Sequence, residues 1–155
     1  MPYANDLSLR LQEILLDGQW IANTNYQQAL SDVDLNIALT KVKDLNTIAL
    51  LTFHINYYIA GVVEAFETEQ LTIRDKFSFD MPTIESESQW QQMKSTLFEN
   101  SRSLIAHVRN LSNEQLDADF FDERYGSYRR NIDGMIEHCY YHLGQIVLIK
   151  KLIMD

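Results

Sequence analysis

Two histidines near the C-terminal end have the clearest spacing for chemistry in this chain. His138 and His142 stand four residues apart in the segment IEHCYYHLGQI. On a helix, this spacing places both imidazoles on one face, about 6 Å apart along the axis. Two ligands of one metal ion commonly have this arrangement. The helical line that contains them begins at Met135 and ends at Ile149, and these apolar ends predict that the line faces inward.

A third histidine, His54, lies in the middle of the apolar segment LLTFHINYYIAG. Facing helices of a bundle approach within about 8–10 Å, so a helix carrying His54 can complete a triangle with His138 and His142. Three neutral imidazoles leave a tetrahedral position open, as catalytic metal sites require. We therefore predict a metal site at these three histidines. The alternative is that they are hydrogen-bonded core or rim residues.

The groups around this trio carry weaker signals. Position 139 is Cys139, so the helix lacks the H-E-x-x-H motif and its general base, and we expect this thiol to pack in the core. His107, in a third helical segment, is interpreted as a rim residue, with metal ligation as the alternative. Glu137 is a candidate partner for the neighbouring imidazole, although a solvated face is favoured. Tyr58 and Glu64 are candidates for the wall of a pocket.

Four segments with helical periodicity must position these residues. We expect them to span residues 5–17, 44–68, 86–109 and 131–153. The chain has only five Gly and two Pro in 155 residues, whereas average usage is about twelve per cent. So few turn formers exclude a β sandwich or barrel. The predicted fold class is therefore all-α, in a single domain over residues 1–155.

Particular residues mark the expected ends of these helices. Gly18 is a natural stop for the first helix, and Asp44 and Asn131 are the expected N-caps of the second and fourth. The third begins at a capping box, in which Ser86 is followed three residues later by Gln89. The connection over residues 19–43 is expected to be packed through Trp20, Tyr26 and Val33 and to contain a short helical piece.

Three glycines, Gly61, Gly134 and Gly144, fall inside the predicted helices. A glycine in a helix interior costs roughly 1 kcal/mol relative to alanine. Close approach of another helix is the expected reason for each of them, in preference to a hinge.

The charge balance restricts the function further. Thirteen Lys and Arg stand against 22 Asp and Glu, a net charge of −9, so neither a nucleic acid nor a membrane surface is an expected partner. We expect no apolar run long enough to span a membrane. The first twenty residues lack the pattern of a signal peptide. Because Cys139 is the lone cysteine, no internal disulfide forms, and a cytoplasmic location is expected.

The two histidine segments together resemble a known family. The stretches LNTIALLTFHINYY and NIDGMIEHCYYHLGQIVLIKKLI look like those of the DinB-like superfamily, in which a histidine within the second helix precedes an H-x-x-x-H-x-G-Q-I motif. The resemblance covers nearly the whole chain. It implies a four-helix bundle in up-down-down-up order, with a long crossover between the second and third helices. It also implies a homodimer and a zinc or nickel ion on His54, His138 and His142.

The resemblance also suggests a reaction. Characterised relatives in that superfamily include S-transferases and isomerases that use low-molecular-weight thiols. A metal-dependent transfer of such a thiol to an electrophilic small molecule is therefore the first functional hypothesis. The alternatives are a metal-dependent hydrolase and a non-catalytic dimeric bundle with a structural metal or none. No catalytic residue beyond the metal ligands is predicted.

Overall fold

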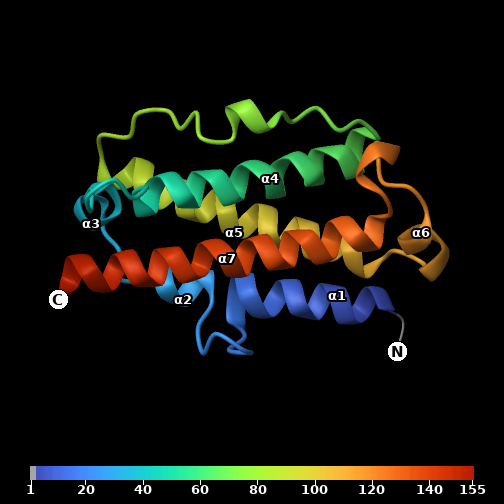
Figure 1. The fold of residues 1–155 in the computed structure, drawn as a ribbon, viewed down its shortest axis with the longest axis horizontal. Coiled ribbons are helices and arrows are strands. Elements are labelled where there is room, and N and C mark those ends of the chain that lie inside the picture. The colour runs from blue at the N-terminus through green and yellow to red at the C-terminus, as the bar shows by residue number, and fades with distance from the viewer. Residues whose placement is uncertain (1–2) are drawn as a thin grey trace.

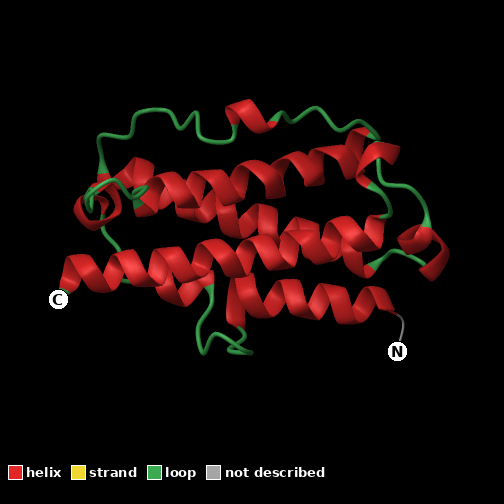
Figure 2. Cartoon of the chain, viewed as in Figure 1, coloured by secondary structure: helices red, strands yellow, loops and turns green. Residues whose placement is uncertain are grey.

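The computed structural model describes residues 3–155, and all of its regular secondary structure is helical (Figure 1; Figure 2). No strand occurs within the described residues. The all-α prediction is therefore confirmed. The seven α-helices of residues 3–155 are α1 (Tyr3–Gln12), α2 (Tyr26–Leu30), α3 (Leu35–Leu39), α4 (Ile48–Thr68), α5 (Glu87–Arg109), α6 (Asn113–Asp117) and α7 (Tyr128–Met154).

The long helices pack side by side around one continuous apolar core. Helix α4 lies along α5 and also contacts α7, while α1 packs against α5. In Figure 1, α4 and α5 begin at the same end of the molecule, and the chain between them runs back over α4. This return segment, residues 69–86, contains only a short 3-10 turn at Asp75–Phe77. It covers the part of α4 that carries His54.

Two of the predicted helix boundaries are confirmed. The Ser86 side chain accepts the backbone N–H of Gln89, whose own side chain accepts the backbone N–H of Ser86, so the capping box is complete. The first helical segment continues from α1 through a π-helical turn, Glu13–Asp17, and ends at Gly18. The capping box is a local hydrogen-bond pattern. Gly18 is in an extended conformation, and a Cβ there would lie 2.5 Å from Glu13 Cα, so only glycine fits this stop.

The predicted caps of the other two long helices are wrong. Thr47, not Asp44, accepts the backbone N–H of Leu50 and begins α4. Ser127, not Asn131, caps α7 by accepting the backbone N–H of Arg130. Each true cap lies near a second residue that is also able to cap a helix. Such competition is resolved by where the chain enters the bundle, which spacing alone does not reveal.

The first connection contains two short helices, α2 and α3, where the sequence predicts one helical piece. Tyr26 and Val33 are buried as expected. The Tyr26 hydroxyl donates to the backbone carbonyl of Cys139 on α7, and the Trp90 indole donates to the carbonyl of Val33. Trp20, in contrast, is 68% exposed, so its predicted role in packing is wrong.

The interior glycines divide into two kinds. A Cβ at Gly61 would lie 2.2 Å from the Ile73 side chain, so close packing explains this glycine, although the neighbour is the return segment and not a helix. A Cβ at Gly134 or Gly144 would meet nothing within 4 Å. For these two positions the packing explanation is wrong.

Helix α4 is the most apolar helix among the long ones, and the expectation that no run is long enough to span a membrane is wrong for it. By length and composition, Ile48–Thr68 would suffice to cross a bilayer. Within the molecule, 56% of its most apolar window is buried, since α5 and α7 pack against it. Core helices share this composition, because burial on several sides demands apolar residues nearly all round.

Candidate metal centre

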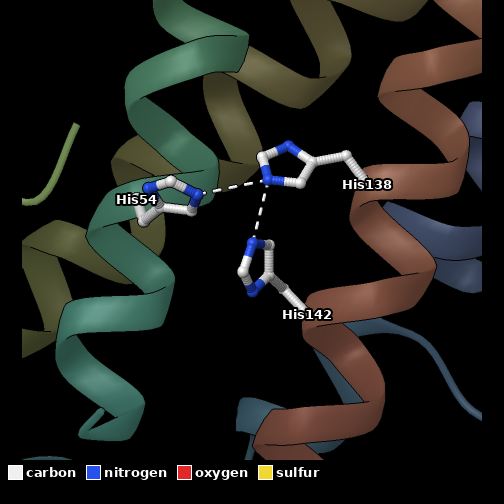
Figure 3. A group of neighbouring side chains, drawn as sticks. All are labelled: His54, His138 and His142. Carbon is white, nitrogen blue, oxygen red and sulfur yellow. Dashed lines mark hydrogen bonds between the residues drawn. The ribbon is translucent and has the colours of Figure 1, made fainter. Parts of the chain in front are cut away.

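The three predicted histidines meet between two helices. His54 projects from the middle of α4, and His138 and His142 project from successive turns of α7 toward it (Figure 3). His54 is 5% exposed and His142 is 6% exposed, while His138 is half-buried. The histidine line of α7 therefore faces inward, as its apolar ends predict.

Their ring nitrogens converge on a small volume. The Nε2 atom of His138 lies 3.2 Å from Nε2 of His54 and 2.8 Å from Nε2 of His142. One ligand atom from each histidine lies within 4.8 Å of the others. A tetrahedral ion with bonds of about 2.0–2.1 Å holds its nitrogen ligands about 3.3 Å apart. Two of the spacings are close to this value, and the third, within 4.8 Å, requires the rings to turn slightly toward a common ion.

Hydrogen bonds on the far side of two rings direct the lone pairs to the centre. Nδ1 of His54 lies 3.1 Å from the backbone oxygen of Ser78. A carbonyl oxygen only accepts, so this Nδ1 carries the proton and Nε2 keeps its lone pair. Nδ1 of His142 lies 2.6 Å from Oε1 of Gln145, which has the same consequence. This far-side support is the usual arrangement for histidines that bind metals.

Hydrogen bonds among the three rings cannot satisfy all of their Nε2 lone pairs. With Nδ1 protonated on both His54 and His142, each of these rings offers an acceptor to His138, yet the neutral His138 ring donates only one proton at Nε2. One Nε2 lone pair must then remain without a donor. A cation at the centre would accept all three lone pairs together, so the donor set fits a metal ion better than a hydrogen-bonded trio.

Burial keeps the imidazoles in the form that binds metals. It lowers the pKa of His54 and of His142 below the usual value. The pKa of His138 falls to about 4, mainly by burial and further by the charge that would develop on the two neighbouring rings. All three rings are therefore neutral at pH 7. A neutral imidazole can coordinate an ion without first losing a proton.

A cleft of about 890 Å³ opens beside this group, and His138 and Tyr58 form part of its wall. The Tyr58 ring meets the rings of His54 and His138 edge-on, each at 5.2 Å between centroids. Its hydroxyl donates to Oδ1 of Asp75, in the return segment. The centre is thus enclosed by the protein on one side and adjoins a space for a small molecule on the other.

Nothing else in the described chain completes the coordination. No fourth His, Cys, Asp or Glu joins the group within residues 3–155. His107 lies elsewhere, stacked on Phe66 with 5.0 Å between ring centroids, so its interpretation as a rim residue is confirmed. Cys139 is buried in the core as predicted, and burial raises the pKa of its thiol to about 12.

The secondary candidates have mixed outcomes. Tyr58 does line the cleft, but Glu64 does not; its carboxylate instead accepts a hydrogen bond from Thr72. Glu137 is exposed and forms no hydrogen bond with His138 among the described residues. Its expected place on a solvated face is therefore confirmed, and it lies at the edge of the cleft.

Three supporting groups were not predicted from the sequence. Gln145 lies on the predicted inward line, and its position three residues after His142 is the signal that could have identified it. Ser78 and Phe79 come from the return segment, and the Phe79 ring stacks on His54 with centroids 4.0 Å apart. No local pattern relates these two residues to a histidine 24 positions earlier.

No protein-family model matches the chain, and no curated protein or solved structure matches it significantly.

Proposed function

We propose that His54, His138 and His142 bind one divalent metal ion, zinc or nickel. The observation that carries this proposal is the convergence of three neutral Nε2 atoms, two of them oriented by acceptors on their far side. Zinc and nickel suit imidazole ligands. The absence of a fourth protein ligand among residues 3–155 favours an exchangeable position over a closed structural site.

We infer further that the fold is the up-down-down-up bundle of the DinB-like superfamily. The parallel course of α4 and α5, joined by the long return segment, supports this arrangement (Figure 1). Membership would also imply a cytoplasmic homodimer. The net charge of −9 supports a partner other than nucleic acid.

The proposed activity is transfer of a low-molecular-weight thiol to an electrophilic small molecule. When bound, the metal would lower the pKa of a coordinated thiol toward neutrality and so supply a nucleophilic sulfur at pH 7. A sulfur–carbon bond forms, the leaving group departs with its bonding electrons, and the thiol proton passes to solvent. The chain contributes the three imidazole ligands and the adjoining cleft, in which a small molecule reaches the metal. Hydrolysis by a coordinated water is the second outcome, and a structural metal is the third.

The decisive experiment uses the cobalt- or nickel-loaded protein and watches the metal directly. Addition of 2-mercaptoethanol should produce a sulfur-to-metal charge-transfer absorption band, because an open position accepts an external thiol. Turnover is then tested with the same thiol and an electrophile such as chlorodinitrobenzene. Metal binding without the band would overturn the thiol chemistry and leave hydrolysis or a structural role. Failure to bind any divalent metal would overturn the whole assignment.

A further inference from the structure

One line of helix α7 connects the proposed metal centre with a positive charge. Arg130, Gly134 and His138 are spaced four residues apart, so they share one face of the helix. All three line the cleft. The separation of eight positions between the first and the last corresponds to about 12 Å along the helix axis. A molecule lying along this line would therefore touch the metal centre at one end and Arg130 at the other.

Gly134 keeps this line open. It is exposed inside a long helix, and a Cβ there would meet nothing within 4 Å. Packing does not require a glycine here, although a helix-interior glycine costs roughly 1 kcal/mol relative to alanine. Any larger residue would project from the same helical face, between Arg130 and His138. The missing side chain leaves room for a ligand along the surface of α7.

Some of the charged groups that line the cleft have an ion-pair partner and others do not. Three of the charged groups in its wall are paired elsewhere: Arg124 with Asp122, Arg129 with Asp117, and Asp133 with Arg10.

The remaining charges lie toward opposite ends of the cleft. The Arg130 guanidinium has no ion-pair or hydrogen-bond partner among residues 3–155. Near the histidines, the carboxylates are those of Asp75, which accepts from Tyr58, and of Glu137. The charges of the protein itself thus favour an anionic group beside Arg130, one cleft length from the metal centre.

We propose that the cleft takes an elongated thiol whose far end is an anion, a carboxylate or a phosphate, which pairs with Arg130. The middle of the molecule lies over Gly134, against an apolar floor that includes Val62, Leu71 and Met135. This inference rests on the proposed function, since it places the sulfur at the metal centre. It adds the length of the ligand and the charge at its distal end.

The test uses ω-mercaptoalkanoic acids of increasing chain length and the matching ω-mercaptoalkanamides. Their dissociation constants are measured from the charge-transfer band of the cobalt-loaded protein. For chains long enough to span about 12 Å, the acid should bind roughly three- to tenfold more tightly than the amide. For the shortest chains, the carboxylate lies beside the metal ion and cannot reach Arg130, so any preference for the acid should be the same in Arg130→Gln.

Two pairs of variants separate the subsite from general effects. Arg130→Gln should remove the preference for the long acid, while Arg102→Gln, an exposed arginine of α5 outside the cleft, should retain it. Gly134→Leu should weaken binding of every long chain roughly tenfold or more and leave 2-mercaptoethanol unaffected. Gly144→Leu is its matched control, because that glycine is equally exposed and uncrowded but does not line the cleft.

A measurement without sulfur or metal tests the anionic subsite separately from the proposed metal chemistry. In the metal-free protein, hexanoate should shift the backbone amide resonance of Gly134 in ¹⁵N spectra more strongly than hexanamide does. This outcome would support the subsite even if no metal binds and the proposed function fails. Equal shifts from both compounds, or an unchanged acid preference in Arg130→Gln, would overturn the anionic subsite while leaving metal binding intact.

Discussion

His54 and His107 have similar aromatic neighbours and very different surroundings otherwise. His54 stacks on Phe79 with ring planes 10° apart, and His107 stacks on Phe66 with ring planes 3° apart. Both rings belong to long helices of the core. Only His54 has a carbonyl acceptor at Nδ1 and further imidazole nitrogens at Nε2. The ring of His107 forms no hydrogen bond within residues 3–155.

The difference shows what makes a histidine a candidate ligand. An aromatic contact is common to both rings, so stacking alone does not select for metal binding; His54 is buried, whereas His107 is only half-buried. What distinguishes His54 is orientation: one nitrogen is fixed by the protein backbone, and the other is aimed at a point shared with two more rings. Substitutions that remove a histidine, its far-side acceptor or its stacked phenylalanine separate the effect of converging nitrogens from that of aromatic packing.

The largest effect is expected from removing a ligand. Substitution of His54, His138 or His142 by Ala should each lower metal affinity by roughly a thousandfold or more, since two imidazoles hold a divalent ion far less tightly than three. His107→Ala should retain one equivalent of metal. The measurement is metal content of the purified proteins by elemental analysis, followed by titration against a chelating dye. Full stoichiometry in any of the three ligand variants would contradict the assignment.

Loss of a far-side acceptor should have the next largest effect. Gln145→Ala removes the group that accepts from Nδ1 of His142, so metal affinity should fall by roughly 10- to 100-fold. Gln145→Glu should preserve affinity, because a carboxylate is also an acceptor. Gln92→Ala is the matched control, since that amide contacts only Thr96 on the surface of α5. Equal affinity in Gln145→Ala and Gln92→Ala would show that convergence alone suffices.

The residues of the candidate site differ in how well they could be predicted from the sequence. The i, i+4 spacing of His138 and His142, and the apolar periodicity around His54, are properties of single helices, so the meeting of these three histidines could be predicted. Gln145 lies within the same helix and could have been assigned with them. Ser78 and Phe79 reach the site through the fold of the return segment, a tertiary arrangement with no periodic signal.

The fold shows the same division. The capping box at Ser86 and the stop at Gly18 are local, and both predictions are confirmed. The starts of α4 and α7 are each decided between two capable capping residues, and the predictions there are wrong. Gly134 is a further case, because its helix can be predicted but the cleft beside it is lined by residues from α1, α4, the return segment, α5, the connection before α7 and α7 itself.

A smaller effect is expected in the pH dependence of the metal-free protein. The pKa of His138 is about 4 in the folded state and about 6.5 in an unfolded chain. Between these values the unfolded state binds more protons, so the free energy of unfolding should rise as the pH increases from about 4 to 6.5. Above that range this contribution is constant. Solvent screening at a half-buried ring limits it to the order of 1 kcal/mol.

The variant His138→Gln tests this assignment, because it removes the titrating ring. Urea unfolding of both metal-free proteins at several pH values should show a shallower rise in the variant over the range from about 4 to 6.5. Groups remote from the site contribute equally to both proteins, so the difference between the two curves reports His138 together with its coupling to His54 and His142. Parallel curves would show that this ring is not held neutral by its surroundings.

The smallest effect concerns the two stacked phenylalanines themselves. Phe79→Leu removes the flat surface against which His54 rests but leaves the Nδ1 contact with the Ser78 backbone, so metal affinity should fall only about threefold. Phe66→Leu should leave metal affinity unchanged and lower the free energy of unfolding by about 1 kcal/mol. Dye competition and urea unfolding, each applied to both variants, supply the four values. If Phe66→Leu weakens metal binding as much as Phe79→Leu, the aromatic contact acts through the stability of the bundle, and the separate treatment of His54 and His107 fails.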